Sequence, residues 1–171
     1  AFFVDSGFTY SGSSASTISG LDHLVGQAVS VLEEGSAHPT KTVASGAITL
    51  DRATTKAHVG LGYTSTLKTP RMEVPLATGT IQGKIKKIYN VTVRFFRTVG
   101  ASVGTSSDNL DTVPFRDSSD AMDTAVPLYT GDKTIEAQPK WDTEGSIIVE
   151  QSQPLPMTVV SIYASVDIQD K

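Results

Sequence analysis

The sequence contains no cysteine, only one tryptophan, and just 19% charged residues among its 171 residues. The absence of cysteine excludes disulfide scaffolds, thiol catalysis and zinc sites built on thiolates. No apolar run approaches the ~20 residues of a membrane-spanning helix, so we expect no membrane span. The formal net charge of −4 argues against a protein whose whole surface binds nucleic acid.

Serine and threonine dominate what is present, with 19 and 21 residues, and hydrophobic residues make up 39% of the chain. Valine (17) and isoleucine (10) outnumber good helix formers over most stretches, and 14 glycines with 8 prolines interrupt them. This balance is typical of β-strands joined by many turns. The composition therefore predicts an all-β fold with less than ~10% helix, because period-two stripes recur and helical periodicity does not.

The first third of the chain predicts a small β module over residues 20–62. Leu21 to Gly26 fits one helical turn or a tight bend. Short strands are expected at 27–32, 41–43, 47–50 and 57–63, with turns at 33–36 and 45–46. Before this module, strands are expected at 2–4 and 8–10, followed by a polar loop at 11–16. Such closely spaced strands indicate a small barrel or sandwich.

Residues 85–99 carry the clearest strand pattern, with one mainly apolar face and one basic face. At ~3.3 Å per residue this strand would span ~50 Å, so we expect a bend or bulge within it. Residues 101–126 predict a long surface loop. Further strands are expected at 128–129, 134–137, 146–150 and 157–168. Residues 1–19 and 63–171 together predict a second, antiparallel β domain.

Catalytic, cofactor and metal sites are not expected. His23, His38 and His58 lack the spacing of metal ligands. Residues 100–104 match the G-x-S-x-G pattern around Ser102, but a hydrolase elbow needs a helix directly after the serine, and none is expected here. The acidic residues of the expected loop lack the order of a calcium-binding hand. They are Asp108, Asp111, Asp117, Asp120 and Asp123.

The basic residues concentrate along the 85–99 strand and just before it. They are Lys84, Lys86, Lys87, Arg94 and Arg97. Such a face could follow a phosphate backbone. The interpretation we favour is a solvated strand face whose charges discourage edge-to-edge pairing.

Motifs over nearly the whole chain carry a family resemblance. They are D-S-G-F-T-Y at 5–10, S-T-I-S-G-L-D-H-L-V-G-Q-A-V-S-V-L at 16–32, S-G-A-I-T-L-D-R-A at 45–53, A-H-V-G-L-G-Y-T-S-T-L-K-T at 57–69, Q-G-K-I-K-K-I-Y-N-V-T-V-R at 82–94, P-L-Y-T-G-D-K at 127–133 and Q-P-L-P-M-T-V-V-S-I at 153–162. The chain resembles tail structural proteins of tailed phages, the nozzle or stabilisation-type proteins with an FCCH-like β domain. Gly62 departs from the proline common in that family, which gives its turn more freedom.

The resemblance implies a non-enzymatic virion protein of the phage tail, without a cofactor. It implies homo-oligomeric rings around the DNA exit channel, contacts with neighbouring tail proteins, and passage of DNA without sequence-specific binding. The chain would then be the C-terminal part of a longer subunit. Rings need two different complementary faces. The candidates for these faces are Lys84, Lys86 and Arg94 on the basic strand, and Asp117 and Asp120 in the acidic loop.

Two other functions remain open. A carbohydrate-binding β module for host recognition is suggested by the Ser/Thr-rich loops and by Trp141, Tyr63 and Tyr89. Stacking of sugars needs aromatic rings exposed in a cleft, whereas most aromatics here are expected on core faces, with Trp141 as the exception. A hydrolase depends only on the Ser102 pattern and is the weakest alternative.

Overall fold

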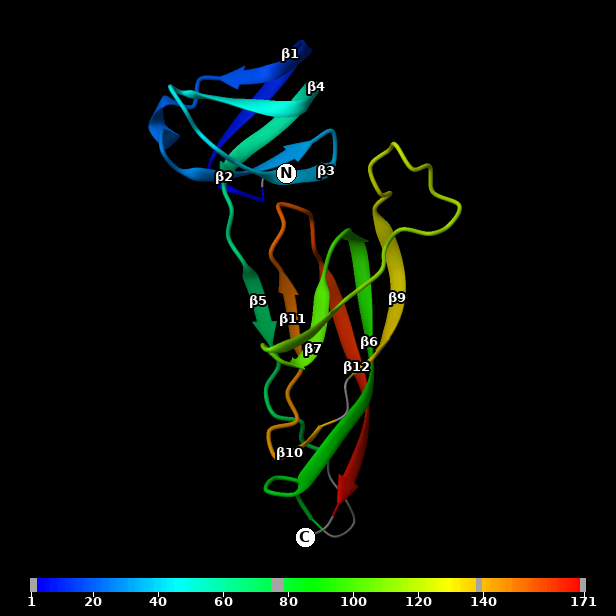
Figure 1. Ribbon diagram of the computed structural model, residues 1–171. Coiled ribbons are helices and arrows are strands. Elements are labelled where there is room, and N and C mark those ends of the chain that lie inside the picture. The colour runs from blue at the N-terminus through cyan, green and yellow to red at the C-terminus, as the bar shows by residue number, and fades with distance from the viewer. Residues whose placement is uncertain (1–2, 75–78, 138–139, 170–171) are drawn as a thin grey trace. The chain divides into compact units, whose positions relative to one another are not determined.

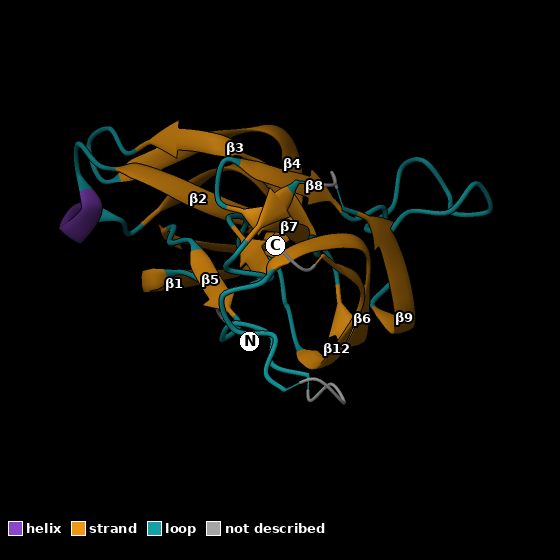
Figure 2. Cartoon of the chain, turned by 90° about the horizontal axis from the view of Figure 1, so that it is seen from below, coloured by secondary structure: helices purple, strands orange, loops and turns teal. Residues whose placement is uncertain are grey.

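The computed structural model describes residues 3–74, 79–137 and 140–169. Strands account for 60% of the structure and helix for 2%, which confirms the all-β prediction (Figure 2). The strand expected at 2–4 begins at Phe2, outside the described residues, and Phe3 and Val4 are not in a strand. Within the described ranges, no helix combines the length and apolar character needed to cross a membrane.

The chain forms two compact units, each assembled from separate stretches of sequence. Among described residues, the first unit holds 3–64, 116–127 and 152–156, and the second holds 65–74, 79–115, 128–137, 140–151 and 157–169. The sequence predicts residues 1–19 in the second unit. Their described part lies in the first, because β1 (Asp5–Ser19) pairs along β4 (Ala47–Leu61).

The sheet of the first unit has the antiparallel order β1-β4-β2-β3, with β2 at Ala28–Glu33 and β3 at Ser36–Thr42 (Figure 1). The loop expected at 11–16 is wrong, since β1 runs through it as one 15-residue strand. Its pairing with β4 shifts register between Ser11 and Ala15. Most side chains of β1 are exposed, so this edge strand carries no apolar alternation from which to predict it.

Two-residue turns reverse the chain between β2 and β3, which pair as a hairpin, and between β3 and β4, which do not pair with each other. Ser45 and Gly46 have φ of 50° and 71°, and Ala44 and Ala47 exchange both backbone hydrogen bonds at 3.0 Å. Glu34 and Gly35 have positive φ as well, between β2 and β3. Such turns match the twist of the strands they join and favour glycine. The turns expected at 33–36 and 45–46 are confirmed.

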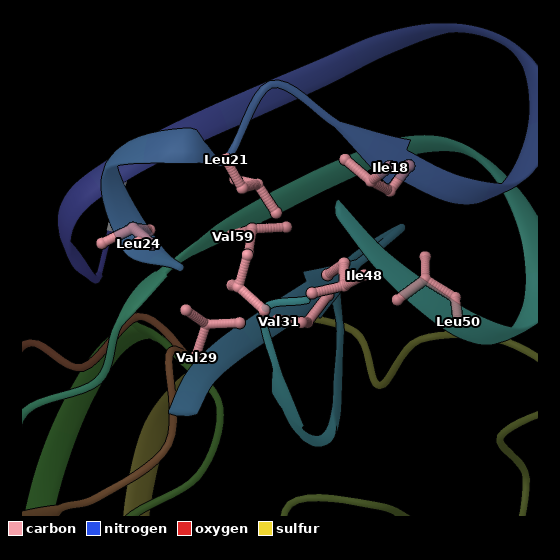
Figure 3. Packing of buried hydrophobic residues seen from close by; sticks show 9 residues of the cluster. Ile18, Leu21, Leu24, Val29, Val31, Ile48, Leu50 and Val59 are labelled. Carbon is pink, nitrogen blue, oxygen red and sulfur yellow. The ribbon is translucent and has the colours of Figure 1, made fainter. Parts of the chain in front are cut away.

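The core of the first unit lies between this sheet and the segment that joins β1 to β2. The short 3-10 helix η1 (Asp22–Leu24) realises the expected helical turn. Leu21 points from this segment toward Val59 of the sheet (Figure 3), and Leu24 and Val31 belong to the same buried cluster. All four side chains are buried, together with Ile18, Val29, Val43, Ile48 and Leu50. Nine apolar side chains removed from water give this unit its own core.

The second unit contains two antiparallel sheets. In the first sheet, β6 (Ile85–Thr98) is central, with β12 (Val159–Gln169) along one edge and β10 (Trp141–Asp142) and β9 (Tyr129–Glu136) along the other. The second sheet has the order β5-β11-β7-β8. Its strands are β5 (Ser65–Lys68), β11 (Ile148–Gln151), β7 (Ser102–Ser106) and β8 (Asn109–Thr112). Among the described residues, none of the three sheets closes into a barrel.

The bulge expected within the long strand is present. Asn90 pairs with Ser165 but Ile88 pairs with Val166, so β6 has one extra residue, Tyr89, at this point. An extra residue reverses which side chains face inward. Lys86 and Ile88 are therefore buried before the bulge, and odd-numbered residues such as Val91 are buried after it.

The long loop expected at 101–126 is wrong over its first half, where β7 and β8 form a hairpin. Val103 lies in β7, and Val113 and Phe115 follow β8; all three side chains are buried. Phe115 packs edge-on against Phe95, with ring centroids 5.4 Å apart. The scattered apolar residues of this stretch, which favour a loop in the sequence, are therefore core residues contributed by a short polar hairpin and the segment after it.

Candidate functional site

The predicted basic face divides at the Tyr89 bulge. Lys86 is only 2% exposed, and its Nζ donates to the carbonyl oxygen of Thr143 at 3.0 Å. Lys84 precedes β6 and is half-buried. Arg94 lies beyond the bulge with its side chain on the exposed face. The expectation of one basic strand face is therefore wrong, because the bulge places Lys86 and Arg94 on opposite faces of the sheet.

Arg94 belongs to an exposed surface that we call the outer face of the β9-β6-β12 sheet. Its Nε and Nη2 each donate to Asp132 at 2.7 Å, and its guanidinium lies 5.9 Å from the ring centroid of Tyr163. Three large apolar side chains are exposed here: Phe96 (50%), Val160 (60%) and Tyr163 (51%). A depression of about 380 Å³ has Arg94, Phe96, Asp132 and Val160 among its lining residues. Arg94 is paired with Asp132 on this surface, while three large apolar groups remain in water.

A second bulge positions Val160. Phe95 pairs with Val159 and Arg94 pairs with Ser161, so Val160 is the extra residue of β12. Bulges re-aim side chains at sheet edges. β12 ends the order of its sheet, and its only strand partner among the described residues is β6. Among the described residues, the other backbone edge of β12 therefore has no strand partner.

The acidic candidates fold their own loop. The backbone N–H of Asp117 donates to Asp120 Oδ2 at 2.8 Å, and that of Ser118 donates to Asp117 Oδ1 at 2.7 Å. Arg116 closes the loop by donating to the carbonyl oxygens of Ala121 and Thr124 at 2.8 and 2.9 Å. Asp117 and Asp120 lie in the first unit, whereas Lys84, Lys86 and Arg94 lie in the second. The acidic and the basic candidate residues therefore belong to different units of the chain.

The three histidines serve separate local contacts. His23 Nε2 lies 3.1 Å from the carbonyl oxygen of Ser6, and His58 Nδ1 lies 3.0 Å from the Thr9 hydroxyl. Burial lowers the pKa of His58 below its ordinary value. His38 Nε2 lies 3.2 Å from Asp51 Oδ2. Across the described ranges, no three His, Asp or Glu side chains gather as a metal site would require.

Ser102 sits within β7, where it pairs with Glu150 of β11 and Thr112 of β8. A strand, and not a helix, continues after it to Ser106. The nucleophile-elbow geometry of a hydrolase, a sharp turn directly into a helix, is therefore not formed at this serine.

The aromatic side chains are more exposed than expected. Tyr63, Tyr89 and Trp141 are all among the exposed large side chains, together with Phe96 and Tyr163 of the outer face. Lys87 Nζ lies 5.7 Å from the ring centroid of Trp141. The expectation that most aromatics other than Trp141 face the core is therefore too strong, since the bulge in β6 turns Tyr89 outward and Tyr63 lies between β4 and β5.

A polar pocket of about 200 Å³ surrounds Lys86, and sequence reasoning missed it. Its lining comes from β5, β6, the β7–β8 turn and the segment before β11: Lys68, Lys86, Ile88, Thr105, Ser106, Ser107, Lys140, Asp142, Glu144, Gly145, Ser146 and Ile148. Lys86 and Ile88 share a side of the strand, and this pairing of a lysine with an apolar residue was the available signal. The alternating pattern does not reveal the pocket, because odd and even positions change faces at the inserted residue Tyr89.

Comparisons with known proteins leave the family undetermined. No protein-family model matches the chain, and no curated protein matches it either. The surfaces described above and the motif resemblance are therefore what a functional proposal can draw on.

Proposed function

We propose that this chain is part of a non-enzymatic structural subunit of a bacteriophage tail, located in the virion. In this proposal it assembles as homo-oligomeric rings around the DNA exit channel and contacts neighbouring tail proteins. DNA passes through without sequence-specific binding, and no cofactor is needed. The motif resemblance over nearly the whole chain supports this function, and the all-β fold is compatible with it.

The outer face of the β9-β6-β12 sheet is the observation that carries the proposal. Phe96, Val160 and Tyr163 leave apolar surface in water around the Arg94–Asp132 pair. Exposed apolar surface rimmed by polar groups marks interaction sites, and aromatic and arginine side chains are enriched there. Because Asp132 already neutralises Arg94, this surface favours a partner with an apolar patch over a nucleic acid.

The free edge of β12 extends the same surface. An unpartnered strand edge presents backbone N–H and C=O groups that another chain can pair with. Val160 joins this edge to the exposed apolar groups. We assign the outer face to one neighbouring copy in the ring, whose contacting surface must be a different one, because ring contacts are heterologous.

Charge substitution on the outer face tests the proposal in the full-length subunit. Phe96→Asp and Val160→Asp should abolish rings seen by electron microscopy while leaving the circular dichroism spectrum unchanged. Val25→Asp is the matched control, because Val25 is also about half exposed but lies in the first unit. Assembly that survives both outer-face substitutions would contradict this interface, and a monodisperse wild-type monomer would contradict ring formation.

A carbohydrate-binding module is the second candidate, favoured by the exposed ring of Trp141 between two residues that line the polar pocket, Lys140 and Asp142. Aromatic faces stack on apolar sugar faces, and flanking charged groups can bind the hydroxyls. Binding to a glycan array by a monomeric protein, lost in Trp141→Ala, would favour this module over the structural subunit.

A further inference from the structure

Lys86 places an ammonium group in the interior of the second unit. Its side chain is among the largest fully buried ones, and Thr143 supplies a carbonyl acceptor at 3.0 Å. An ammonium group has three N–H donors. Among the described residues, no carboxylate lies within ion-pair distance of Lys86 and Thr143 provides its one hydrogen bond. A buried ammonium with so few acceptors is costly unless a partner offsets its desolvation.

Of the two carboxylates that line the pocket, Glu144 is paired with Arg71, and Asp142 keeps its charge but accepts a hydrogen bond from the backbone of its own segment. Glu144 Oε1 accepts from Arg71 Nη2 at 2.5 Å, and Asp142 Oδ1 accepts from the backbone N–H of Glu144 at 3.1 Å. The hydrogen bond from the Thr80 hydroxyl is the main cause of the lowered pKa of Glu73, and the charge of Lys86 adds a smaller contribution. With Lys68 and Lys140 also in the lining, the positive charge around Lys86 exceeds what these acids neutralise.

The segment before β11 is shaped around the lysine stem. Gly145 has a φ of +57°, and a Cβ there would lie 2.8 Å from Lys86 Cδ. Glycine at this position therefore leaves room for the lysine and permits the left-handed backbone. Thr143 in the same segment supplies the carbonyl that holds Nζ. Lys86 is thus held in place by backbone rather than left as a mobile surface charge.

Hydroxyl groups complete the lining of the pocket. Thr105, Ser106 and Ser107 come from the end of β7 and the turn to β8, and Ser146 comes from the segment before β11. Hydroxyl and ammonium groups together donate hydrogen bonds to oxygen atoms of an anion. The pocket is smaller than the ~300–1,000 Å³ of sites for drug-sized ligands, which limits the occupant to a small group.

We propose that the pocket around Lys86 binds a small tetrahedral oxyanion of the size of inorganic phosphate. Lys86 supplies the buried charge, Lys140 and Lys68 supply exposed charges at the rim, and the serine and threonine hydroxyls supply further donors. This inference is independent of ring assembly, because the whole site lies within one unit of one chain.

Thermal unfolding with inorganic phosphate, against chloride at equal ionic strength, tests the site. A ligand that binds the native state raises the unfolding temperature in a concentration-dependent way. We expect such a rise for the wild type and its loss in Lys86→Met. Lys87→Met is the matched control, because Lys87 neighbours Lys86 but lies over Trp141 and is not part of the lining. It should retain the full rise.

Lys140→Met keeps the test valid if Lys86→Met does not fold, because Lys140 is exposed. Calorimetric titration with phosphate should show roughly tenfold weaker binding in this variant, the effect of one charge-assisted hydrogen bond. Binding of sulfate as well would support the oxyanion class, and binding of glucose 6-phosphate would indicate a phosphomonoester as the source. Equal unfolding temperatures in phosphate and chloride for the wild type, or unchanged phosphate binding in Lys140→Met, would overturn the proposal.

Discussion

Arg94 and Asp132 form a two-point ion pair between β6 and β9, with Nε and Nη2 each 2.7 Å from a separate carboxylate oxygen. The two side chains are 49% and 41% exposed. The hydrogen bonds from Arg94 lower the pKa of Asp132, and the carboxylate raises the pKa of Arg94. The pair holds two exposed side chains in one geometry on the outer face, so Arg94 is not a free charge for steering a distant partner.

Acid should weaken this pair in a defined direction. Because the folded-state pKa of Asp132 lies below its ordinary 3.8, its stabilisation is present above 3.8 and is lost as the pH falls through the lower folded-state value. We expect urea unfolding to show a small stability deficit of Asp132→Asn at neutral pH, since exposed pairs are screened. That deficit should shrink in acid. A deficit that stays constant down to the lowest pH would show that the pair contributes nothing through charge.

Exchanging the partners separates internal pairing from contact with a neighbour. Arg94→Asp alone places two carboxylates opposite each other on adjacent strands, which should lower stability and impair ring assembly. The double variant with Asp132→Arg should recover both. If the double variant recovers its urea midpoint but does not assemble, the neighbouring copy contacts the charge of Arg94 directly. Replacing Lys86 by Glu does not serve this purpose, because that residue is buried.

How much the sequence could predict depends on how each strand is buried. The all-β class, the Ser45-Gly46 turn and the bulged strand at 85–98 follow from turn chemistry and period-two patterns. Residues 11–16 were missed because an edge strand with both faces mostly in water has no apolar stripe. The β7–β8 hairpin was missed because its two strands are only five and four residues long and rich in polar residues.

The candidate site could be predicted less well than the fold. The alternation of side chains along a strand predicts which face each one occupies only where no residue is inserted. Tyr89 is an inserted residue in β6, so odd and even positions exchange faces there. Lys86 was therefore assigned to a solvent face although it is buried. The position of the bulge depends on pairing with β12, about seventy residues later in the chain, and no local pattern reports it. The polar pocket and the divided basic face both follow from that single inserted residue.

Truncating Leu21 should destabilise the first unit strongly. Its side chain is 0% exposed and points into the cluster shown in Figure 3. We expect Leu21→Ala to lower the free energy of unfolding by about 2–5 kcal/mol, because lost burial and a residual cavity add. Val25→Ala, at a side chain that is 51% exposed, should change it by less than about 0.5 kcal/mol. Urea denaturation measures both, and equal effects would mean that this cluster is not the core.

The glycine pattern at 100–104 is better explained by packing than by chemistry. Gly104 lies in β7 opposite β8, and a Cβ on it would overlap the backbone carbonyl oxygen of Asn109. The hairpin must open to accept any side chain, so we expect Gly104→Ala to destabilise by about 1–3 kcal/mol, as overpacking does. Gly12→Ala is the control, because a Cβ there meets only the ring end of Tyr10. Ser102→Ala should leave stability nearly unchanged, and a tolerant Gly104 would contradict the close approach of the two strands.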